Sequence, residues 1–502
     1  MSFVDEAVDV VSVESLWRKS QGSRCESRSC QTLPVTSKET SVQVRAASEA
    51  GTQTEWKQDQ RALDVDLGPL LDYPDVGKFL KRVEEDMIRE LKRSWRSRAF
   101  DGFEVTREEQ NPQVSCLHSL QYPDAVADHL QVTSVTWNAT GSVLACSYGR
   151  LGDGDWSTEK SYVCTWNLDR RGFNPHHPDL ALDVPSSVMC LAFHPSRPSL
   201  IAGGLYNGEV LVWDTSRTDD PLIGRTGLSA DSHMDAVYQV QWLQEGPQSH
   251  KLQVLSVSTD GKILVWQMEK EGQLTLHNGY ALVSQQMPSR MNKHIRGDTA
   301  VGVTCLSSSR FDPSVFVVGV EGGHLLKCST AVQTAALTSM ASSIPLKAPA
   351  QFTFSPHGGP VYCVDCSPFH RNLFLSAGTD GHAHLYSMLQ EKPLASLQLS
   401  QKYLFSIQWS PVRPLVFAAA SGEGELLLFD FGKSSQKPSL SIKQTSNEKP
   451  VYCLAFNQAQ SQLLAAGDGT GVVKIWQLSS DFTEQGAREM QTLDELAGAV
   501  TD

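Results

Sequence analysis

The sequence lacks three features that would assign a class of protein directly: a long apolar run, an excess of basic residues and an apolar leader. None of its apolar runs approaches the ~20 residues needed to cross a bilayer, so direct membrane insertion is not expected. The formal net charge of −13 argues against nucleic-acid binding, which needs a basic surface. The acidic start, Met1 to Val10, does not fit a signal peptide. We therefore expect a cytoplasmic protein.

Catalytic and cofactor-binding motifs are also missing. The glycine-rich stretch from Gly467 to Gly471 lacks the Gly-Lys-Ser/Thr ending of a phosphate-binding loop. His176 and His177 have no further metal ligand near them in the sequence, and no serine, cysteine or carboxylate pair stands out as a catalytic group. The sequence thus predicts a protein that is not an enzyme and that uses no cofactor and no metal.

What the sequence does contain is one short strand-like phrase repeated seven times in the same register. Each copy is followed by a strand of small residues, a turn with Gly or Asp, and a strand that usually ends in an aromatic residue. Such repetition is typical of a β-propeller, and seven copies predict seven blades. The segment Gln113–Leu120 is predicted to close the ring against the last blade. The copies begin at Val132, Val188, Val237, Val303, Val361, Leu404 and Val451.

The register of the repeats explains several of the 11 cysteines. Four occupy the third position of the phrase, where a small buried residue is expected: Cys190, Cys305, Cys363 and Cys453. Cys363 and Cys366 form a Cys-x-x-Cys pair, but residues three apart on a strand point to opposite faces. Since no second pair completes a four-ligand site, we expect core packing rather than metal binding.

Two of the repeats carry a recurring set of polar residues. The third repeat has, in order, His233, Ser256, Asp260 and Trp266. This set resembles the WD-repeat family, in which the four side chains hydrogen-bond across one blade. The fifth repeat keeps the His, Ser and Asp of the set but has Tyr386 in place of Trp. The residues predicted to have structural roles in the blades are Trp166, Trp213, Asp214, His233, Asp260, Trp266, His357, Asp380 and Trp476.

Residues 1–70 are predicted to form a disordered arm, because the stretch from Ser20 to Gln60 has one Leu and one Trp, too few to bury a core. Three phrases there place Gln between residues that mostly favour extended backbone. They are Cys30-Gln31-Thr32, Val42-Gln43-Val44 and Thr52-Gln53-Thr54. Such peptides can add a strand to the exposed sheet edge of a partner protein. An unbound linker is the alternative for any copy taken alone.

Residues 71–101 are predicted to contain one amphipathic helix, from Asp75 to Arg98, with Pro74 just outside it. Its other face is charged, with eight basic and four acidic residues between Lys78 and Arg98. Because an isolated helix of this length is marginal in water, we expect its apolar stripe to bind a separate protein. Packing on the propeller's own rim is the alternative. The stripe residues recur at steps of three or four, and they are Val76, Phe79, Leu80, Val83, Met87, Leu91 and Trp95.

The order of these parts resembles the intermediate chains of dynein: an arm with Gln-centred motifs, an amphipathic helix, an all-β propeller over 107–480 and a C-terminal tail over 481–502. Among them the chain is similar to the WD-repeat intermediate chains of cytoplasmic dynein-2, the motor of retrograde intraflagellar transport. The third arm motif resembles the Thr-Gln-Thr anchor of peptides that bind the hub light chain. The segments that carry the resemblance are 99–105, 149–156, 352–359 and 367–381.

The resemblance implies a non-catalytic motor subunit. Its propeller would bind the tail of the dynein-2 heavy chain, its Gln-centred peptides would bind hub and Tctex-type light chains, and its helix would bind a roadblock-type light-chain dimer. Through these light chains it would pair with a second, different intermediate chain. It would support retrograde intraflagellar transport and cilium assembly, in the cytoplasm and at the cilium, axoneme, ciliary base and centrosome. The alternative is a WD-repeat scaffold or substrate receptor of another complex, such as a ubiquitin ligase.

Overall fold

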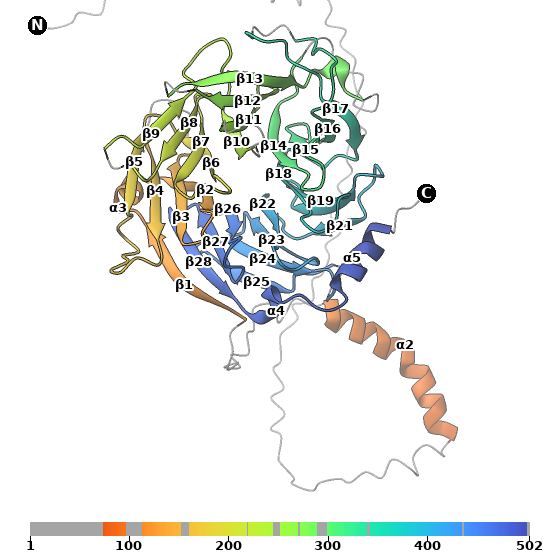
Figure 1. Cartoon of the computed structure of the whole chain (residues 1–502). Coiled ribbons are helices and arrows are strands. Elements are labelled where there is room, and N and C mark those ends of the chain that lie inside the picture. The colour runs from red at the N-terminus through yellow and green to blue at the C-terminus, as the bar shows by residue number, and fades with distance from the viewer. Residues whose placement is uncertain are drawn as a thin grey trace, which may run out of the picture. The chain divides into compact units, whose positions relative to one another are not determined.

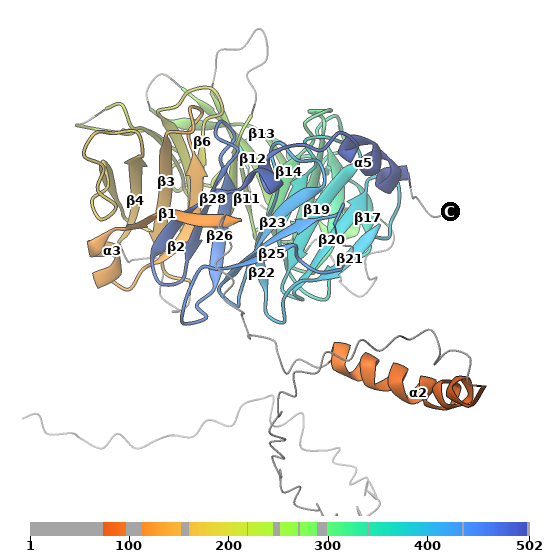
Figure 2. The same cartoon turned by 90° about the horizontal axis from the view of Figure 1, so that it is seen from below.

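The computed structural model describes residues 74–96, 113–151, 160–217, 219–243, 252–269, 272–288, 299–338, 342–433 and 436–498. The chain divides into two compact units, Met1–Thr106 and Arg107–Asp502. The first contributes helix α2 (Pro74–Arg96). The second is a ring of small β-sheets (Figure 1, Figure 2). Within these described ranges, no helix is both long and apolar enough to cross a membrane.

Seven four-stranded sheets make up the ring, which confirms the predicted seven-bladed propeller. Blade 1 consists of β2 (Gln131–Trp137), β3 (Val143–Gly149), β4 (Ser161–Asn167) and β5 (Leu180–Val184). Blade 2 consists of β6 (Val188–Phe193), β7 (Leu200–Leu205), β8 (Val210–Asp214) and β9 (Leu222–Arg225). Blade 3 consists of β10 (Val237–Trp242), β11 (Gln253–Ser258), β12 (Lys262–Met268) and β13 (Leu274–Ala281), which is followed by the short 3₁₀ helix η1 (Ser284–Gln286).

The next three blades repeat this arrangement. Blade 4 consists of β14 (Val303–Ser308), β15 (Val315–Val320), β16 (Leu325–Ser329) and β17 (Ala350–Phe354). Blade 5 consists of β18 (Val361–Cys366), β19 (Leu373–Gly378), β20 (His382–Ser387) and β21 (Ala395–Gln398). Blade 6 consists of β22 (Leu404–Trp409), β23 (Val416–Ser421), β24 (Glu425–Asp430) and β25 (Leu440–Lys443). The first strand of each blade lies innermost, where it contacts the first strands of the two neighbouring blades.

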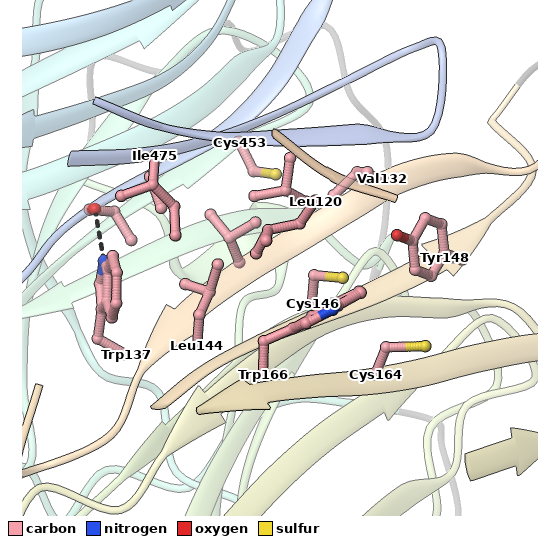
Figure 3. Packing of buried hydrophobic residues seen from close by; sticks show 14 of the residues in the cluster. Leu120, Val132, Trp137, Leu144, Cys146, Tyr148, Cys164, Trp166, Cys453 and Ile475 are labelled. Atoms are coloured by element: carbon pink, nitrogen blue, oxygen red, sulfur yellow. Dashed lines mark hydrogen bonds between the residues drawn. The ribbon is translucent and has the colours of Figure 1, made fainter. Parts of the chain in front are cut away.

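The seventh blade joins the two ends of this unit. It consists of β26 (Val451–Phe456), β27 (Leu463–Asp468), β28 (Val472–Leu478) and, as its outermost strand, β1 (Val114–Gln121). Strand β1 pairs antiparallel with β28, so it closes the ring as predicted for 113–120. Side chains from β1, blade 7 and blade 1 form one buried cluster at the closure, where Leu120, Cys453 and Ile475 are packed with residues of blade 1 (Figure 3). The short helix α3 (Pro123–Ala127) links β1 to blade 1.

Neighbouring blades are held together by side chains of the inner strands. At four of the joints, the fifth residue of the repeated phrase accepts a hydrogen bond from the backbone N–H of the sixth residue in the next blade. The four acceptor and donor pairs are Thr136 with Phe193 at 3.2 Å, Ser307 with Cys366 at 2.9 Å, Asp365 with Trp409 at 2.7 Å, and Gln408 with Phe456 at 2.7 Å.

The other three joints use different side chains of the same strands. Gln239 of blade 3 donates to the carbonyl of Leu306 and accepts from its N–H. In blades 2 and 7 the fifth residue is alanine, which has no polar side chain. There the sixth residue of the next blade is a tryptophan whose indole donates to the alanine carbonyl: Trp242 to Ala192 at 2.9 Å and Trp137 to Ala455 at 3.0 Å. Hydrogen bonds between the repeated phrases therefore connect each blade to the next around the ring.

The cysteines of the phrase take part in these joints. The thiol of Cys363 donates to the carbonyl of Ile407 in blade 6, and that of Cys366 donates to the carbonyl of Ser307 in blade 4. The two thiols point toward opposite neighbours, which confirms the expectation for residues three apart on a strand. Burial raises the pKa of the Cys366 thiol to about 12, so it stays protonated at neutral pH.

Asp365 is the one carboxylate among the four fifth-position acceptors, and burial raises its pKa to about 6. A raised pKa means that the fold disfavours the ionised form, so stability falls as the pH rises from about 4 to above 6. We expect Asp365→Asn, which keeps the oxygen that accepts from Trp409, to raise the free energy of unfolding by about 3 kcal/mol at pH 7.5 and by less than about 1 kcal/mol at pH 4. Urea denaturation across this pH range measures the difference.

The equivalent position of the next blade supplies the control. Gln408→Glu places a carboxylate at the same point of the blade 6 joint, so it should destabilise the protein above pH 6 where Asp365→Asn stabilises it. A pH-independent effect of Asp365→Asn would contradict the assignment.

The segment predicted as a C-terminal tail contains two helices, α4 (Ser480–Thr483) and α5 (Glu489–Gly498), that pack on the propeller. Phe482 of α4 lies in the apolar cluster between blades 6 and 7. Leu493 and Ala497 of α5 lie in the cluster between blades 5 and 6. The guanidinium of Arg413 holds α5 in place, because it bonds the Glu489 carboxylate and the carbonyl of Asp481 and lies 3.1 Å from Asp430.

Candidate functional site

Helix α2 is the first candidate surface, because its apolar stripe is exposed. At 23 residues the helix is about 34 Å long. Phe79 is 51% exposed, Met87 57% and Leu91 66%, while Val83 is partly buried. The helix begins at Pro74 and not after it; proline suits a first helical position because its missing N–H would have no partner there.

Charged residues flank the stripe of α2 and pair along the helix. Arg89 lies 2.6 Å from Asp86, and Arg93 lies 3.7 Å from Glu90, both three residues apart. These exposed pairs stabilise the helix by only a few tenths of a kcal/mol each. The exposed apolar side chains of α2, and not its ion pairs, therefore determine what the helix can bind. They can be buried in the groove of a partner protein.

Not all predicted binding residues fall in the part of the chain that the structure describes. The three Gln-centred motifs, at 30–32, 42–44 and 52–54, lie outside the described residues. All seven stripe residues lie in α2, and the side chains that the structure describes among them are those of Phe79, Val83, Met87 and Leu91.

In blade 3 the four residues His233, Ser256, Asp260 and Trp266 are joined by hydrogen bonds, an arrangement that we call the relay. His233 Nδ1 lies 3.2 Å from the Asp260 carboxylate, and its Nε2 lies 2.7 Å from Ser256 Oγ. The Trp266 indole donates to the same hydroxyl at 2.8 Å. Burial alone would raise the pKa of Asp260, but the hydrogen bonds from His233 and from backbone N–H groups outweigh it and lower the pKa. The relay ties the loop before β10 to β11 and β12.

Blade 5 has the same relay without its last member. His357 Nδ1 lies 3.0 Å from Asp380, and its Nε2 lies 2.7 Å from Ser376 Oγ. The hydroxyl of Tyr386 donates to the carbonyl of Ser355 at 2.7 Å and not to Ser376. A tyrosine hydroxyl at this position reaches farther than an indole N–H, so it bonds the loop instead of the serine.

The sequence analysis missed a relay in blade 7 and a single polar contact in blade 6. In blade 7 the indole of Trp476 donates to the side-chain oxygen of Gln444 at 2.8 Å, and the Gln444 amide donates to Asp468 at 3.1 Å. Gln444 thus takes the place of the histidine. In blade 6 the hydroxyl of Ser400 donates to Glu423 at 3.1 Å. Gln444 lies seven residues before its repeated phrase instead of four, so a search at the histidine spacing passes over it.

The remaining predicted blade residues have packing roles. Trp166 is 1% exposed, and its indole nitrogen has no partner among the described residues, because Cys146 stands where blade 3 has its serine. Trp213 packs over Gly203, where an added Cβ would lie 2.7 Å from its ring. Asp214 accepts from the N–H and hydroxyl of Ser216 and so orders the turn after β8.

A row of aromatic side chains crosses three blades at the start of their inner strands. The ring centroids of Tyr362 and Phe405 are 5.2 Å apart, and those of Phe405 and Tyr452 are 4.9 Å apart. Tyr403, which is 49% exposed, lies 6.0 Å from Phe405. Large amphipathic rings gathered at a surface are the usual anchors of a protein interface. The sequence signal was the aromatic residue at the second position of the phrase in blades 5, 6 and 7.

Known proteins match this chain along most of its length. A model of the WD40 domain of dynein axonemal intermediate chain 3 matches residues 156–263, and a model of the WD domain, G-beta repeat, matches 349–387 and 438–477. Mouse cytoplasmic dynein 2 intermediate chain 2 is 60% identical over 501 residues, which cover 99% of this chain and 93% of the mouse protein. The chain belongs to the dynein intermediate chain family.

Other members of this family also match the chain over long alignments. The human cytoplasmic dynein 2 intermediate chain 2 is 60% identical over 498 residues, which cover 99% of this chain and 92% of the human protein. The ciliary dynein intermediate chain 3 of Heliocidaris crassispina is 28% identical over 386 residues, 76% of this chain and 58% of that protein. Because the mouse alignment spans nearly the whole dynein intermediate chain, it includes α2 as well as the propeller.

Proposed function

We propose that the chain is a non-catalytic intermediate chain of cytoplasmic dynein 2. Its propeller binds the tail of the motor heavy chain, and its N-terminal region binds dynein light chains. The observation that carries the proposal is the 60% identity to cytoplasmic dynein 2 intermediate chain 2 over 99% of this chain. Because the identity extends over both units, it supports the same two roles for them here: heavy-chain binding by the propeller and light-chain binding by the N-terminal unit.

The features of α2 support the assignment of a light chain to this helix. A roadblock-type dimer binds along α2 and buries Phe79, Met87 and Leu91, whose present exposure costs hydrophobic free energy. The Gln-centred motifs at 31, 43 and 53 bind hub and Tctex-type light chains by adding a strand to their sheets. Paired light chains then link this chain to a second, different intermediate chain. Binding sites joined on one chain gain affinity through effective concentration.

This assignment implies that the protein acts in the cytoplasm and at the cilium, axoneme, ciliary base and centrosome, in retrograde intraflagellar transport and cilium assembly.

The aromatic row of Tyr362, Tyr403, Phe405 and Tyr452 offers the propeller one surface for a helical partner. A rigid platform suits such a partner, because it loses little conformational freedom on binding.

Deleting residues 1–98 from the full-length chain tests the division of labour. The shortened chain keeps β1, blades 1–7 and α5, so its propeller remains closed. Expressed in ciliated cells, it should retain the motor heavy chain at near the full-length level and lose the light chains and the second intermediate chain. Quantitative mass spectrometry of the purified complexes measures both. Loss of the heavy chain together with the light chains would refute the proposed division, and a ubiquitin ligase in place of the motor would favour the substrate-receptor alternative.

A further inference from the structure

Blade 5 contains a cluster of three histidines that its fold does not require. Strand β20 begins His382-Ala383-His384, and alternate residues of a strand lie on one face. The imidazole rings of His382 and His384 are 5.7 Å apart and nearly parallel, at 15°. The ring of His384 also lies 4.3 Å from that of His357, the histidine of the blade 5 relay.

Blade 3 shows what the same relay looks like without this cluster. Ser376 pairs with His384 across β19 and β20, as Ser256 pairs with Leu264 across β11 and β12. Leu264 is fully buried in the apolar core. The His–Asp–Ser part of the relay is the same in both blades, so it does not depend on a histidine at this position. His384 therefore places a second imidazole beside His357, whose two ring nitrogens are already hydrogen-bonded to Asp380 and Ser376.

The Nδ1 atom of His384 has no hydrogen-bond partner within the described residues, although His384 is only 9% exposed. A buried polar atom without a partner is costly, so an unpaired one calls for a reason. His357, Asp380 and His384 each offer one ligand atom, and these three atoms lie within 4.8 Å of one another. The Nδ1 atom of His357 lies 3.0 and 3.1 Å from the two Asp380 oxygens.

We propose that blade 5 binds a divalent transition metal ion, with zinc the best match, through His357 Nδ1, the Asp380 carboxylate and His384 Nδ1. Two imidazole nitrogens and one carboxylate oxygen are a donor set that suits zinc, with ligand distances of about 2.0–2.2 Å. Neighbouring ligands of such an ion lie roughly 3.3 Å apart, so ligand atoms that now lie within 4.8 Å of one another need to approach by about 1.5 Å at most. Water completes the coordination from the side of Asp380, whose side chain is 16% exposed.

The relay of blade 5 supplies the supporting contacts of this site. The metal replaces the hydrogen that His357 Nδ1 donates to Asp380. The His357 ring then binds as the tautomer with its hydrogen on Nε2, which donates to Ser376 Oγ at the observed 2.7 Å. Hydrogen bonds of this kind fix the orientation of metal-binding histidines. The N–H groups of Gly358 and His382 donate to Asp380 and orient its carboxylate. The ion ties β20 to the loop before β18 and so reinforces blade 5.

His384→Leu is the decisive variant, because blade 3 shows that leucine fits this position beside an intact relay. The full-length chain, prepared without a histidine tag and dialysed against a weak chelator, should retain about one zinc ion per chain by plasma mass spectrometry. His384→Leu should reduce this content at least tenfold. His382→Asn is the matched control: its side chain is not a ligand, so the zinc content should not change.

Thermal unfolding gives a second measurement that does not depend on metal retained through purification. Added zinc should raise the midpoint of the metal-depleted wild-type chain and leave that of His384→Leu unchanged. The proposal is overturned if the wild-type chain neither retains zinc nor gains stability from it. It is equally overturned if His384→Leu keeps the metal, or if His382→Asn loses it as fully as His384→Leu does.

Discussion

Replacing Val83 and Leu91 of α2 with aspartate is expected to abolish binding of the proposed roadblock-type light chain. Each substitution removes an apolar side chain from the stripe and introduces a charge that the partner's groove would have to bury. Losing about 2 kcal/mol of buried apolar surface at each position corresponds to roughly a thousandfold loss of affinity. Pull-down of the light chain with the full-length variant, followed by calorimetry with the α2 peptide, measures the effect.

The charged face of the same helix supplies the control for this experiment. Lys81 and Lys92 are exposed and lie away from the stripe. The variant Lys81→Asp with Lys92→Asp introduces the same two aspartates and a larger change of charge, but it leaves the stripe intact and should keep most of the binding. Unchanged binding of the Val83→Asp and Leu91→Asp variant, with helix content preserved by circular dichroism, would show that the stripe serves another partner.

The repeat register made most of the propeller predictable. A phrase with Val, Leu or Ile at its first and fourth positions indicates which side chains face the core, and its recurrence gives the number of blades. A closed ring leaves no unpaired strand edge in the last blade, and the predicted closing segment does pair with that blade, as β1 along β28. The stripe of α2 was equally visible, because helical spacing is a local property of the sequence.

The features that the sequence did not reveal depend on contacts between distant segments. Gln444 meets Trp476, which is 32 residues away, and Gln239 meets Leu306, which is 67 residues away. No local periodicity links such pairs, so the replacement of a relay histidine by glutamine is visible only once the blades are in place. His384 was passed over for a similar reason: a histidine on a strand is ordinary until the loop that carries His357 lies against it.

The C-terminal helices were missed because their anchor comes from blade 6. The sequence of 489–498 has few apolar residues to mark a helical face. In the structure, Leu493 and Ala497 are the apolar residues of α5 that are buried. Their position is set by Arg413, which lies 76 residues before Glu489 in the sequence. Arg413 is 7% exposed, Asp430 1% and Glu489 8%, so the three charges form a buried group. Burial acts to lower the pKa of Arg413, but its bonds to Glu489 and the charge of Asp430 outweigh this and raise it.

Replacing Arg413 with methionine is therefore expected to destabilise the propeller strongly. Methionine replaces the apolar stem of arginine but not its guanidinium, so the carboxylates of Asp430 and Glu489 stay buried without their cation. Removing one partner of such a group costs about 3–5 kcal/mol, a large share of the stability of a typical domain. The loss should first appear as faster hydrogen exchange in α5, since releasing this helix lets water reach both carboxylates.

A double-mutant cycle separates the charge effect from lost packing. In the variant Arg413→Met with Glu489→Gln, one of the two stranded charges is removed together with the arginine, so its loss of stability should be smaller than the sum of the two single losses by more than about 1 kcal/mol. Additive losses would mean that Arg413 acts by filling space. Hydrogen exchange in blade 3, which contacts neither residue, should stay at the wild-type rate while α5 opens, because the joints on both sides of blade 3 are made by other side chains.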